Sequence, residues 1–241
     1  MKTIIIIQAR MGSSRLPGKV LKELGDTIVL DYDVSRCREI QPIHDVIVAT
    51  SLLSQDDTIE EWCTKNDVAV FRGSEHDVLS RYYECAKLYN PDHVIRVTSD
   101  CPFVDYKFAN SIVKHMQQNP VDVARIEGDL PRGLAIEMLS FDALEYIHRN
   151  GHEPRHREHV TYYAYEYADQ FTSTWISAPV SMRHPQLRIT LDTKEDYALC
   201  RAIAENFVGD KLISSQQVVD YLLENPEIAK LNAHIQQKPV I

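Results

Sequence analysis

The amino-acid sequence predicts an α/β fold in which helices cover both faces of a central sheet. Short runs rich in β-branched residues alternate with longer amphipathic stretches along most of the 241 residues. The first run holds four consecutive isoleucines, Ile4 to Ile7, as is typical of a strand buried on both faces. No repeat and no Gly/Ser-rich linker interrupts this alternation. We therefore expect a single domain over residues 1–241.

Hydrophobic periodicity predicts the individual elements in chain order. Apolar or β-branched runs predict strands at Thr3–Gln8, Asp45–Thr50, Ala69–Arg72, His93–Thr98, Val121–Arg125, Ala135–Leu139 and Leu187–Leu191. Apolar residues at helical spacing predict helices at Asp56–Lys65, His76–Leu88, Lys107–Gln118, Phe141–His148, His156–Tyr167, Lys194–Phe207 and Ser215–Leu223. The stretch from Asn150 to Asp169 is rich in His, Arg and Tyr without a clean period. We expect an inserted arm or an interface near residues 150–170.

Composition excludes several classes of protein. The chain has 26 Lys and Arg against 35 Asp and Glu, a net charge of −9, which argues against a nucleic-acid partner. No apolar run approaches the roughly 18 residues of a membrane span, so we expect no membrane partner. The five cysteines are widely spaced and form no C-x-x-C pair. Reduced thiols in a cytoplasmic protein are therefore expected.

A basic loop follows the first predicted strand, and ligands of open α/β sheets bind beyond such strand ends. The segment Ala9–Lys19 holds two glycines, two serines, two arginines and a lysine. Glycine lets backbone N–H groups approach a ligand closely, and Arg and Lys match phosphate oxygens. The segment thus predicts a phosphate-binding loop, although it is neither a Walker A motif nor G-x-G-x-x-G. The alternative is a solvated basic loop.

Two aspartates end β-rich runs elsewhere in the chain. Asp100 lies in Arg96–Pro102, and Asp192 lies in Arg188–Thr193, where a predicted helix begins. Two carboxylates at strand ends are suited to Mg²⁺, which takes few protein carboxylates together with substrate phosphate oxygens. The alternatives are that Asp192 caps the following helix and that Asp100 caps the turn before Pro102.

Other chemistries are less favoured by the sequence. Four histidines have spacings that suit zinc, but arginines lie among them and disfavour a cation: His148, His152, His156 and His159. No G-x-S-x-G segment supports a serine nucleophile. Cys101 follows Asp100 directly and is interpreted as a packed thiol.

Six segments together resemble the sugar-acid cytidylyltransferases, most closely the branch named for the spore coat polysaccharide biosynthesis protein SpsF. They are Gln8–Lys19, Phe71–Leu79, Arg96–Pro102, Pro131–Gly133, Arg157–Thr161 and Arg188–Asp196. They span nearly the whole chain in the order of the family. The resemblance implies the nucleotide-diphosphosugar transferase fold, with a mixed, mostly parallel sheet of about seven strands.

The resemblance also implies roles for individual residues. The catalytic set is Arg10, Lys19, Asp100 and Asp192, and the last two are the implied magnesium ligands. The nucleotide-binding set is Ala9, Arg10, Gly12, Ser13, Ser14, Arg15, Lys19, Arg72, Gly73, Ser74, Thr98 and Asp100, of which Arg72 to Ser74 border the cytosine. The acceptor-binding set is Arg132, Glu137 and His159. Ala135 departs from the family, which usually has an acidic residue there. A homodimer is expected, with Tyr162–Tyr167 as its interface.

The expected activity is transfer of CMP from CTP to a sugar acid or related acceptor, with release of pyrophosphate, in surface polysaccharide biosynthesis. One alternative is a glycosyltransferase of the same fold, but the Asp-x-Asp motif usual in that class is lacking around Asp100. The other is a non-catalytic nucleotide-binding subunit, which would be expected to lack a metal carboxylate or a basic residue of the loop. Both sets are intact in the sequence.

Overall fold

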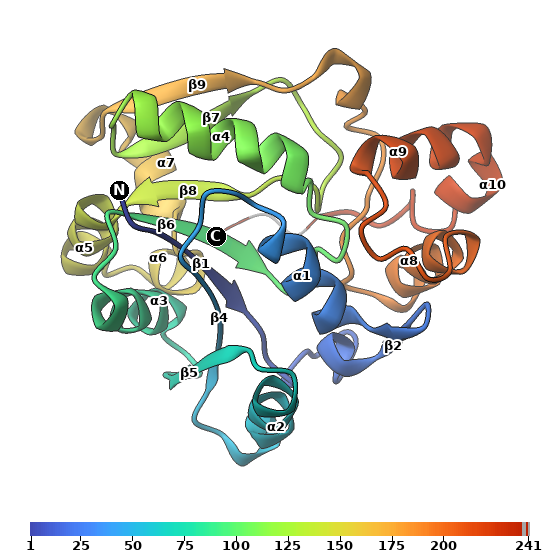
Figure 1. Ribbon diagram of the computed structural model, residues 1–241, viewed down its shortest axis with the longest axis horizontal. Helices are drawn as coiled ribbons and strands as arrows, with labels where there is room; N and C mark the ends of the chain where they lie inside the picture. The colour runs from blue at the N-terminus through green and yellow to red at the C-terminus, as the bar shows by residue number, and fades with distance from the viewer. Residues whose placement is uncertain (238–239, 241) are drawn as a thin grey trace.

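A seven-stranded sheet lies at the centre of the molecule (Figure 1). The structure is a computed structural model that describes residues 1–237 and 240. The strands lie in the order β5-β4-β1-β6-β8-β7-β9 across the sheet. Their bounds are β1 Thr3–Gln8, β4 Asp45–Ser51, β5 Ala69–Gly73, β6 His93–Thr98, β7 Val123–Glu127, β8 Glu137–Ser140 and β9 Ser173–Ser177.

The sheet is mixed and mostly parallel, which confirms the predicted fold class. Strand β8 is antiparallel to both β6 and β7, whereas the pairs β1–β4, β1–β6, β4–β5 and β7–β9 are parallel. Strands β1 and β6 are neighbours, with Gln8 opposite Thr98. The loops that follow these two strands therefore leave the sheet at the same edge.

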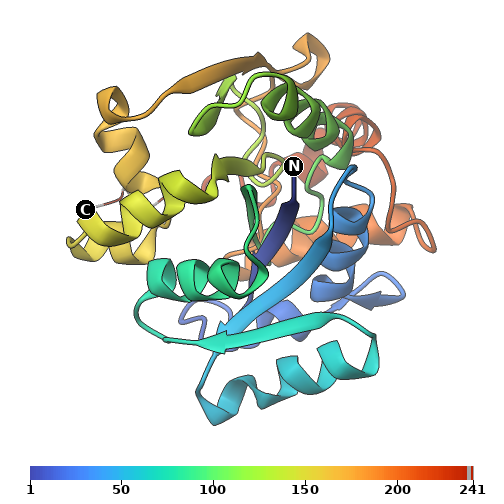
Figure 2. The same cartoon turned by 60° about the vertical axis from the view of Figure 1, so that its left-hand side comes forward.

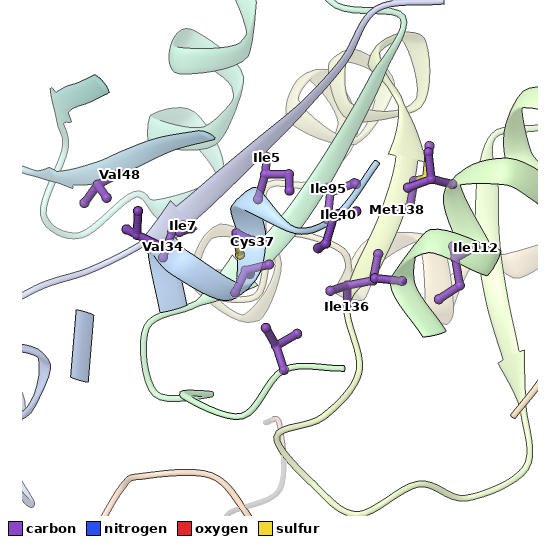
Figure 3. Close-up of a cluster of buried hydrophobic side chains, with 14 of the residues drawn as sticks. Ile5, Ile7, Val34, Cys37, Ile40, Val48, Ile95, Ile112, Ile136 and Met138 are labelled. Atoms are coloured by element: carbon purple, nitrogen blue, oxygen red, sulfur yellow. The ribbon is translucent and has the colours of Figure 1, made fainter. Parts of the chain in front are cut away.

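Helices cover both faces because successive side chains of β1 point to opposite sides. Ile5 and Ile7 pack with side chains of α1 (Val29–Arg38), α2 (Asp57–Lys65) and α4 (Tyr106–Gln118), as Figure 3 shows in part. Ile4 and Ile6 pack against α3 (Val78–Tyr89) and α5 (Phe141–Asn150). The two views in Figures 1 and 2 show α1 and α3 on opposite sides of β1 and β4. Each fully buried isoleucine contributes about 1.5–3 kcal/mol.

A third apolar cluster joins the C-terminal helices to the first loop region. It packs residues of α8 (Lys194–Asn206) and α9 (Ser215–Glu224) against Leu24, Val29 and Tyr32. The remaining elements are η1 Lys19–Leu21, β2 Glu23–Leu24, β3 Thr27–Ile28, η2 Ser54–Asp56, α6 Pro154–Glu158, α7 Tyr162–Glu166, η3 Ala168–Gln170, η4 Val180–Met182 and α10 Pro226–Ala229. This cluster places the start of α8 beside the loop that follows β1.

Two predicted elements are wrong. Residues 187–191 do not form a strand, because their backbone bonds to loops beyond the sheet: Ile189 N donates to Arg132 O at 2.8 Å, and Leu191 N to Asp100 O at 2.7 Å. The predicted helix over residues 156–167 is broken into α6 and α7. It breaks where Val160 turns into the core beneath α3 and α5.

Besides the shortest elements, helix α1 and strand β9 were not predicted from the sequence. Helix α1 buries Asp33 and Arg36 among its apolar residues, and these charges hide the helical period. Strand β9 lies at the edge of the sheet and is only partly buried, so its sequence STWIS lacks a clear apolar face. Trp175 of β9 lines the main cleft of the molecule.

Candidate active site

A cleft of about 1000 Å³ opens at the edge of the sheet where β1 and β6 end. Its lining includes Lys19, Asp100 and Asp192 at one end. The other end is lined by residues from β7, β8, β9 and the α6–α7 region. We call these the phosphate end and the acceptor end, after the ligands that the family resemblance of the sequence leads us to expect there.

The loop after β1 is held in shape by its own backbone and by a buried aspartate. Met11 O accepts from Ser13 N at 2.9 Å and from Gly18 N at 3.1 Å, which closes the loop. Met11 N donates to Asp56 Oδ1 at 2.8 Å. Gly18 has φ +66°, a left-handed conformation that favours glycine, and it caps the short helix that begins at Lys19. The loop thus presents Lys19 to the cleft from a fixed backbone.

Lys19 bridges the two aspartates that the sequence singles out. Its Nζ donates to Asp100 Oδ2 and to Asp192 Oδ1, both at 2.9 Å. Burial by itself would raise the pKa of Asp100, but the Lys19 ammonium and a hydrogen bond from Thr98 hold it well below its ordinary value. Burial lowers the pKa of Lys19, but the two carboxylates more than offset this and raise it. Lys19 and Asp100 are therefore both charged at neutral pH.

Asp192 is fixed by further ion pairs. Arg15 Nη2 lies 3.3 Å from Asp192 Oδ1, and Arg188 Nη2 lies 3.1 Å from Asp192 Oδ2. The capping alternative does not hold for Asp192, because Thr193 is the N-cap of α8 and forms a capping box with Asp196. The Asp100 carboxylate accepts from Lys19 Nζ and from the Cys101 thiol, and within residues 1–237 no backbone N–H of the turn before Pro102 donates to it. Both carboxylates instead face the cleft.

Most of the predicted nucleotide-binding residues lie together, but one segment does not. Arg10, Gly12, Ser13, Ser14, Arg15, Lys19, Thr98 and Asp100 line the cleft. Ala9 is buried and continues the sheet by donating to Ala49 O at 3.2 Å. Arg72, Gly73 and Ser74 lie outside the lining, and the Arg72 guanidinium pairs with Asp57 and Glu60 at 2.7 and 2.6 Å.

Glu75 connects that outlying segment to the loop, and sequence reasoning missed it. Arg10 Nη1 donates to both Glu75 O and Glu75 Oε1 at 3.0 Å. A Cβ on Gly12 would lie 3.3 Å from the same carboxylate and 3.0 Å from Gln55 Nε2. The segment that begins at Arg72 therefore reaches the phosphate loop through Glu75. The only signal in the sequence was its position within a family-like segment.

At the acceptor end, Glu137 is neutralised within the chain. It forms an ion pair with Arg96, and Thr161 Oγ1 donates to Glu137 Oε1 at 2.7 Å. Burial alone would raise the pKa of Glu137, but Arg96 and Thr161 hold it below its ordinary value. Ala135, two residues earlier, is exposed and also lines the cleft. Glu137 thus supplies a carboxylate near the position where Ala135 lacks one.

The other acceptor-end residues come from separate segments. Arg132 is exposed, and His159 is partly buried, which lowers the pKa of its imidazole. The 150–170 segment contributes Glu158, His159 and Tyr165 to the lining. Arg125 and Trp175 also line the cleft and were missed, since nothing in the sequence brings β7 and β9 together.

The four histidines have different surroundings. His148 stacks on Tyr83 with ring centroids 4.2 Å apart, and His156 is buried with Nε2 against the Glu166 carboxylate. His152 is exposed, and His159 lines the cleft. Within the described chain, no group of three or more His, Cys, Asp or Glu side chains is arranged to hold a metal ion.

The pair Asp100 and Asp192 nevertheless fits Mg²⁺. Both carboxylates lie within hydrogen-bond distance of a single cationic nitrogen, so they converge on one point in the cleft. Mg²⁺ is usually held by one or two carboxylates plus substrate phosphates and water, rather than by an all-protein cage. The carboxylate oxygens are the correct donor type for this ion.

The fold and this site together define a nucleotidyltransferase of the α/β class: a glycine-bearing basic loop after β1 faces two carboxylates across a cleft. The sequence profile described as Cytidylyltransferase matches residues 4–238. The chain belongs to the cytidylyltransferase family, whose members are CTP-dependent enzymes.

Two relatives cover nearly the whole chain. The spore coat polysaccharide biosynthesis protein SpsF of Bacillus subtilis is 36% identical over 231 residues, 94% of this chain and 96% of its own length. An uncharacterized protein of Methanocaldococcus jannaschii is 37% identical over 239 residues, 99% of this chain and 97% of its own.

Two solved structures are similar in fold. A cytidylyltransferase from Leptospira borgpetersenii has a TM-score of 0.89 and 32% identity, covering 99% of this chain and 100% of its own. A CMP:2-keto-3-deoxy-manno-octonic acid synthetase complexed with CTP has a TM-score of 0.68 and 17% identity, covering 86% of this chain and 100% of its own. The second likeness concerns the fold alone. Over residues 1–237 and 240, no helix has the length and apolar character needed to cross a membrane.

Proposed function

We propose that this chain transfers CMP from CTP to the hydroxyl of a sugar acid or related acceptor and releases pyrophosphate. The observation that carries the proposal is the convergence of Lys19, Asp100 and Asp192 at the end of the cleft nearest the loop after β1. The cationic side chains of a basic loop bind phosphate oxygens, and a pair of carboxylates binds a metal ion. The acceptor end leaves room beside this centre for a second substrate.

The reaction requires one bond to form and one to break. The acceptor oxygen attacks the α-phosphorus of CTP, and the bond from that phosphorus to the bridging oxygen of pyrophosphate breaks. The hydroxyl proton is lost to water, and pyrophosphate leaves with the bond electrons. Arg10, Arg15 and Lys19 hold the phosphate oxygens and stabilise the charge that develops on the leaving group. Positioning of the two substrates in one cleft supplies much of the remaining rate enhancement.

A divalent cation belongs to the same proposal. Asp100 and Asp192 would hold Mg²⁺, which supplies Lewis-acid neutralisation of phosphate charge when bound. Gly12, Ser13 and Ser14 border the phosphates, and the Thr98 hydroxyl lies 3.4 Å from the Cys101 thiol, which donates to Asp100.

The base and the acceptor are assigned to opposite sides of this centre. We retain Arg72 to Ser74 as the border of the cytosine, with Glu75 linking them to Arg10. Arg132, Glu137 and His159 are assigned to the acceptor, and all three line the cleft. Glu137 acts there as a hydrogen-bonding carboxylate already balanced by Arg96.

The biological setting follows the relative with a named role. The name of the Bacillus subtilis relative supports surface polysaccharide biosynthesis for this chain. A cytoplasmic location and a homodimer are parts of the same proposal, and sedimentation equilibrium tests the dimer. Within its proposed interface Tyr162–Tyr167, Tyr163 is buried in the chain and Tyr165 lines the cleft. The side chains left for a partner are therefore those of Tyr162, Glu166 and Tyr167.

Pyrophosphate release from CTP with a panel of sugar acids tests the activity. We expect release that depends on both an acid and Mg²⁺, and a larger thermal shift with CTP than with ATP, GTP or UTP. CTP at 100 times its Kd raises the unfolding free energy by roughly 2.7 kcal/mol. Equal shifts with all four nucleotides contradict the CTP assignment. Binding of CTP without pyrophosphate release favours a non-catalytic subunit, and hydrolysis or transfer from a nucleotide sugar favours a glycosyltransferase.

A further inference from the structure

Arg125 is a buried arginine in the cleft, and no carboxylate of the described residues neutralises its charge. Its exposed fraction is 7%, and it lies on β7 where the lining passes from the sheet to the α6–α7 region. Among the ion pairs formed by residues 1–237, none includes Arg125. An isolated buried charge costs several kcal/mol, so its presence requires an explanation.

The side chain of Arg125 is held in one orientation by neutral groups. Its Nε donates to Ser173 Oγ at 2.9 Å, and its Nη2 donates to Ala164 O at 2.8 Å. The guanidinium carbon lies 5.1 Å from the ring centroid of Tyr165. Within the described chain, Nη1 has no hydrogen-bond partner. The side chain is therefore fixed while part of its donor capacity is unused.

A second buried arginine shows what a purely structural role looks like. Arg36 is also buried without a carboxylate hydrogen bond, but all three of its nitrogens donate within the protein. Their acceptors are the carbonyl groups of Val104, Lys211 and Ile213 and the hydroxyl of Ser215. Arg36 does not line the cleft. Arg125 differs in two ways: its Nη1 has no acceptor within the described chain, and it lines the cleft. Both differences indicate a ligand.

The charge balance of the acceptor end defines that ligand as an anion. Arg96 is compensated by Glu137, so the pair adds no net charge. The other acids of this end, Asp129 and Glu158, are exposed and form no ion pair with Arg125. Arginine offers a planar pair of N–H donors that matches a carboxylate. Among residues 1–237, Arg125 is thus the buried cation of this end that has no carboxylate partner.

We propose that Arg125 binds the carboxylate of the acceptor and so selects acids over neutral sugars. The inference rests on the proposed function for the existence of an acceptor, and it adds a residue that the family resemblance did not supply. Trp175 lies opposite Arg125 in the β7–β9 register and is 63% exposed in the lining. Its ring offers an apolar wall to the carbon skeleton next to the carboxylate.

Direct binding tests the proposal without relying on turnover. Isothermal titration calorimetry would use the whole chain in the presence of Mg²⁺, with a non-hydrolysable analogue in place of CTP. The probes are a panel of 2-keto sugar acids that includes 3-deoxy-manno-octulosonate, together with the methyl ester of each. We expect Arg125→Gln to weaken acid binding on the order of 10- to 100-fold, as for a lost charge-assisted pair, and to leave the Kd of the analogue unchanged.

Matched variants separate this role from a loss of folding. Arg183→Gln is the control, because Arg183 also donates to a backbone carbonyl, that of Ala178, but lies outside the lining. Ser173→Ala keeps the charge of Arg125 and removes only the bond to its Nε, so we expect a several-fold loss of acid affinity at an unchanged Tm. Arg125→Lys should retain part of the affinity for the acid, since the positive charge remains but the planar pair of N–H donors is lost.

Each outcome decides the proposal. It is overturned if no acid binds, if the methyl esters bind as tightly as the acids, or if Arg125→Gln and Ser173→Ala both bind acids like Arg183→Gln. Pyrophosphate release is measured separately. If acids bind through Arg125 but CTP yields no pyrophosphate, the proposed function fails while the carboxylate-binding role of Arg125 is supported. If pyrophosphate is released but Arg125→Gln keeps the wild-type KM for the acid, the proposed function is supported and the role of Arg125 is wrong.

Discussion

The two ends of the cleft balance their charges differently. At the phosphate end, Arg10, Arg15 and Lys19 each face a carboxylate of the chain, from Glu75, Asp192 and the Asp100–Asp192 pair. At the acceptor end, Arg96 is balanced by Glu137, whereas Arg125 has no carboxylate partner in the part of the chain that the structure describes. The phosphate end therefore pairs each of its cations with a carboxylate. When substrate binds, phosphate oxygens would replace the carboxylates as partners of the cations, and a metal ion would replace Lys19 as the partner of Asp100 and Asp192. The acceptor end is prepared for one anion.

The largest effect is expected at the carboxylates of the phosphate end. Asp192→Asn should lower turnover by orders of magnitude, because the amide cannot supply the charge that holds Mg²⁺ between enzyme and phosphates. Its oxygen can still accept from Lys19, so we expect a stability loss of about 1 kcal/mol, or 2–4 °C in Tm. Pyrophosphate release and calorimetric melting measure the two effects.

Asp196→Asn is the matched control for that variant. Asp196 also pairs with Arg188, but it is fully buried and closes the capping box of α8. It should lose more Tm and less activity than Asp192→Asn. Asp100→Asn should resemble Asp192→Asn, and the double variant should lose far less than the product of the single losses, as for residues that act as a unit. A fully multiplicative loss, or an active Asp192→Asn enzyme, contradicts a shared metal site.

A smaller effect, on stability, is expected from Lys19→Met, and it depends on pH. The Lys19 ammonium depresses the pKa of Asp100 in the folded chain. A depressed carboxyl pKa contributes stability above its unfolded value, about 3.9, and this is lost as the pH falls through the folded value. The variant should therefore be less stable than wild type by about 3 kcal/mol near pH 7. The gap should narrow below about pH 4.

Melting temperatures between pH 3 and pH 8 measure this gap. Lys22→Met is the control, because Lys22 lies on the same loop against the Tyr197 ring and forms no ion pair among the described residues. The difference in melting temperature between Lys22→Met and wild type should be small at every pH. A Lys19→Met gap that does not change with pH would show that Lys19 contributes through packing and not through charge.

The smallest effect is expected at the acceptor end from Trp175→Ala. The ring is 63% exposed, so its removal should leave Tm nearly unchanged. Loss of one aromatic wall should raise the KM for the acid by roughly two- to tenfold, equivalent to about 0.5–1.5 kcal/mol. The KM for CTP should not change. Leu88→Ala, an exposed apolar residue on α3 outside the lining, should change neither constant.

Local pattern was enough to predict the scaffold of the phosphate end. The bounds of β1 and β6 agree with the predicted Thr3–Gln8 and His93–Thr98, because an apolar run between polar residues is a property of the segment itself. The basic loop and Asp100 follow those strands directly, so a sheet rule places both at one edge. Asp192 was predicted for the right place but from a strand that is absent, since residues 187–191 bond to loops instead.

Only the tertiary structure decided which charges meet. Lys19 and Asp192 are 173 residues apart, and their contact depends on where the third apolar cluster places the start of α8. The guanidinium of Arg125 is held by β9 and α7, two segments whose own patterns are weak or were misjudged. Periodic burial is local and can be predicted from the order of residues. Charge pairing depends on which loops converge beyond the sheet, and no local pattern contains that information.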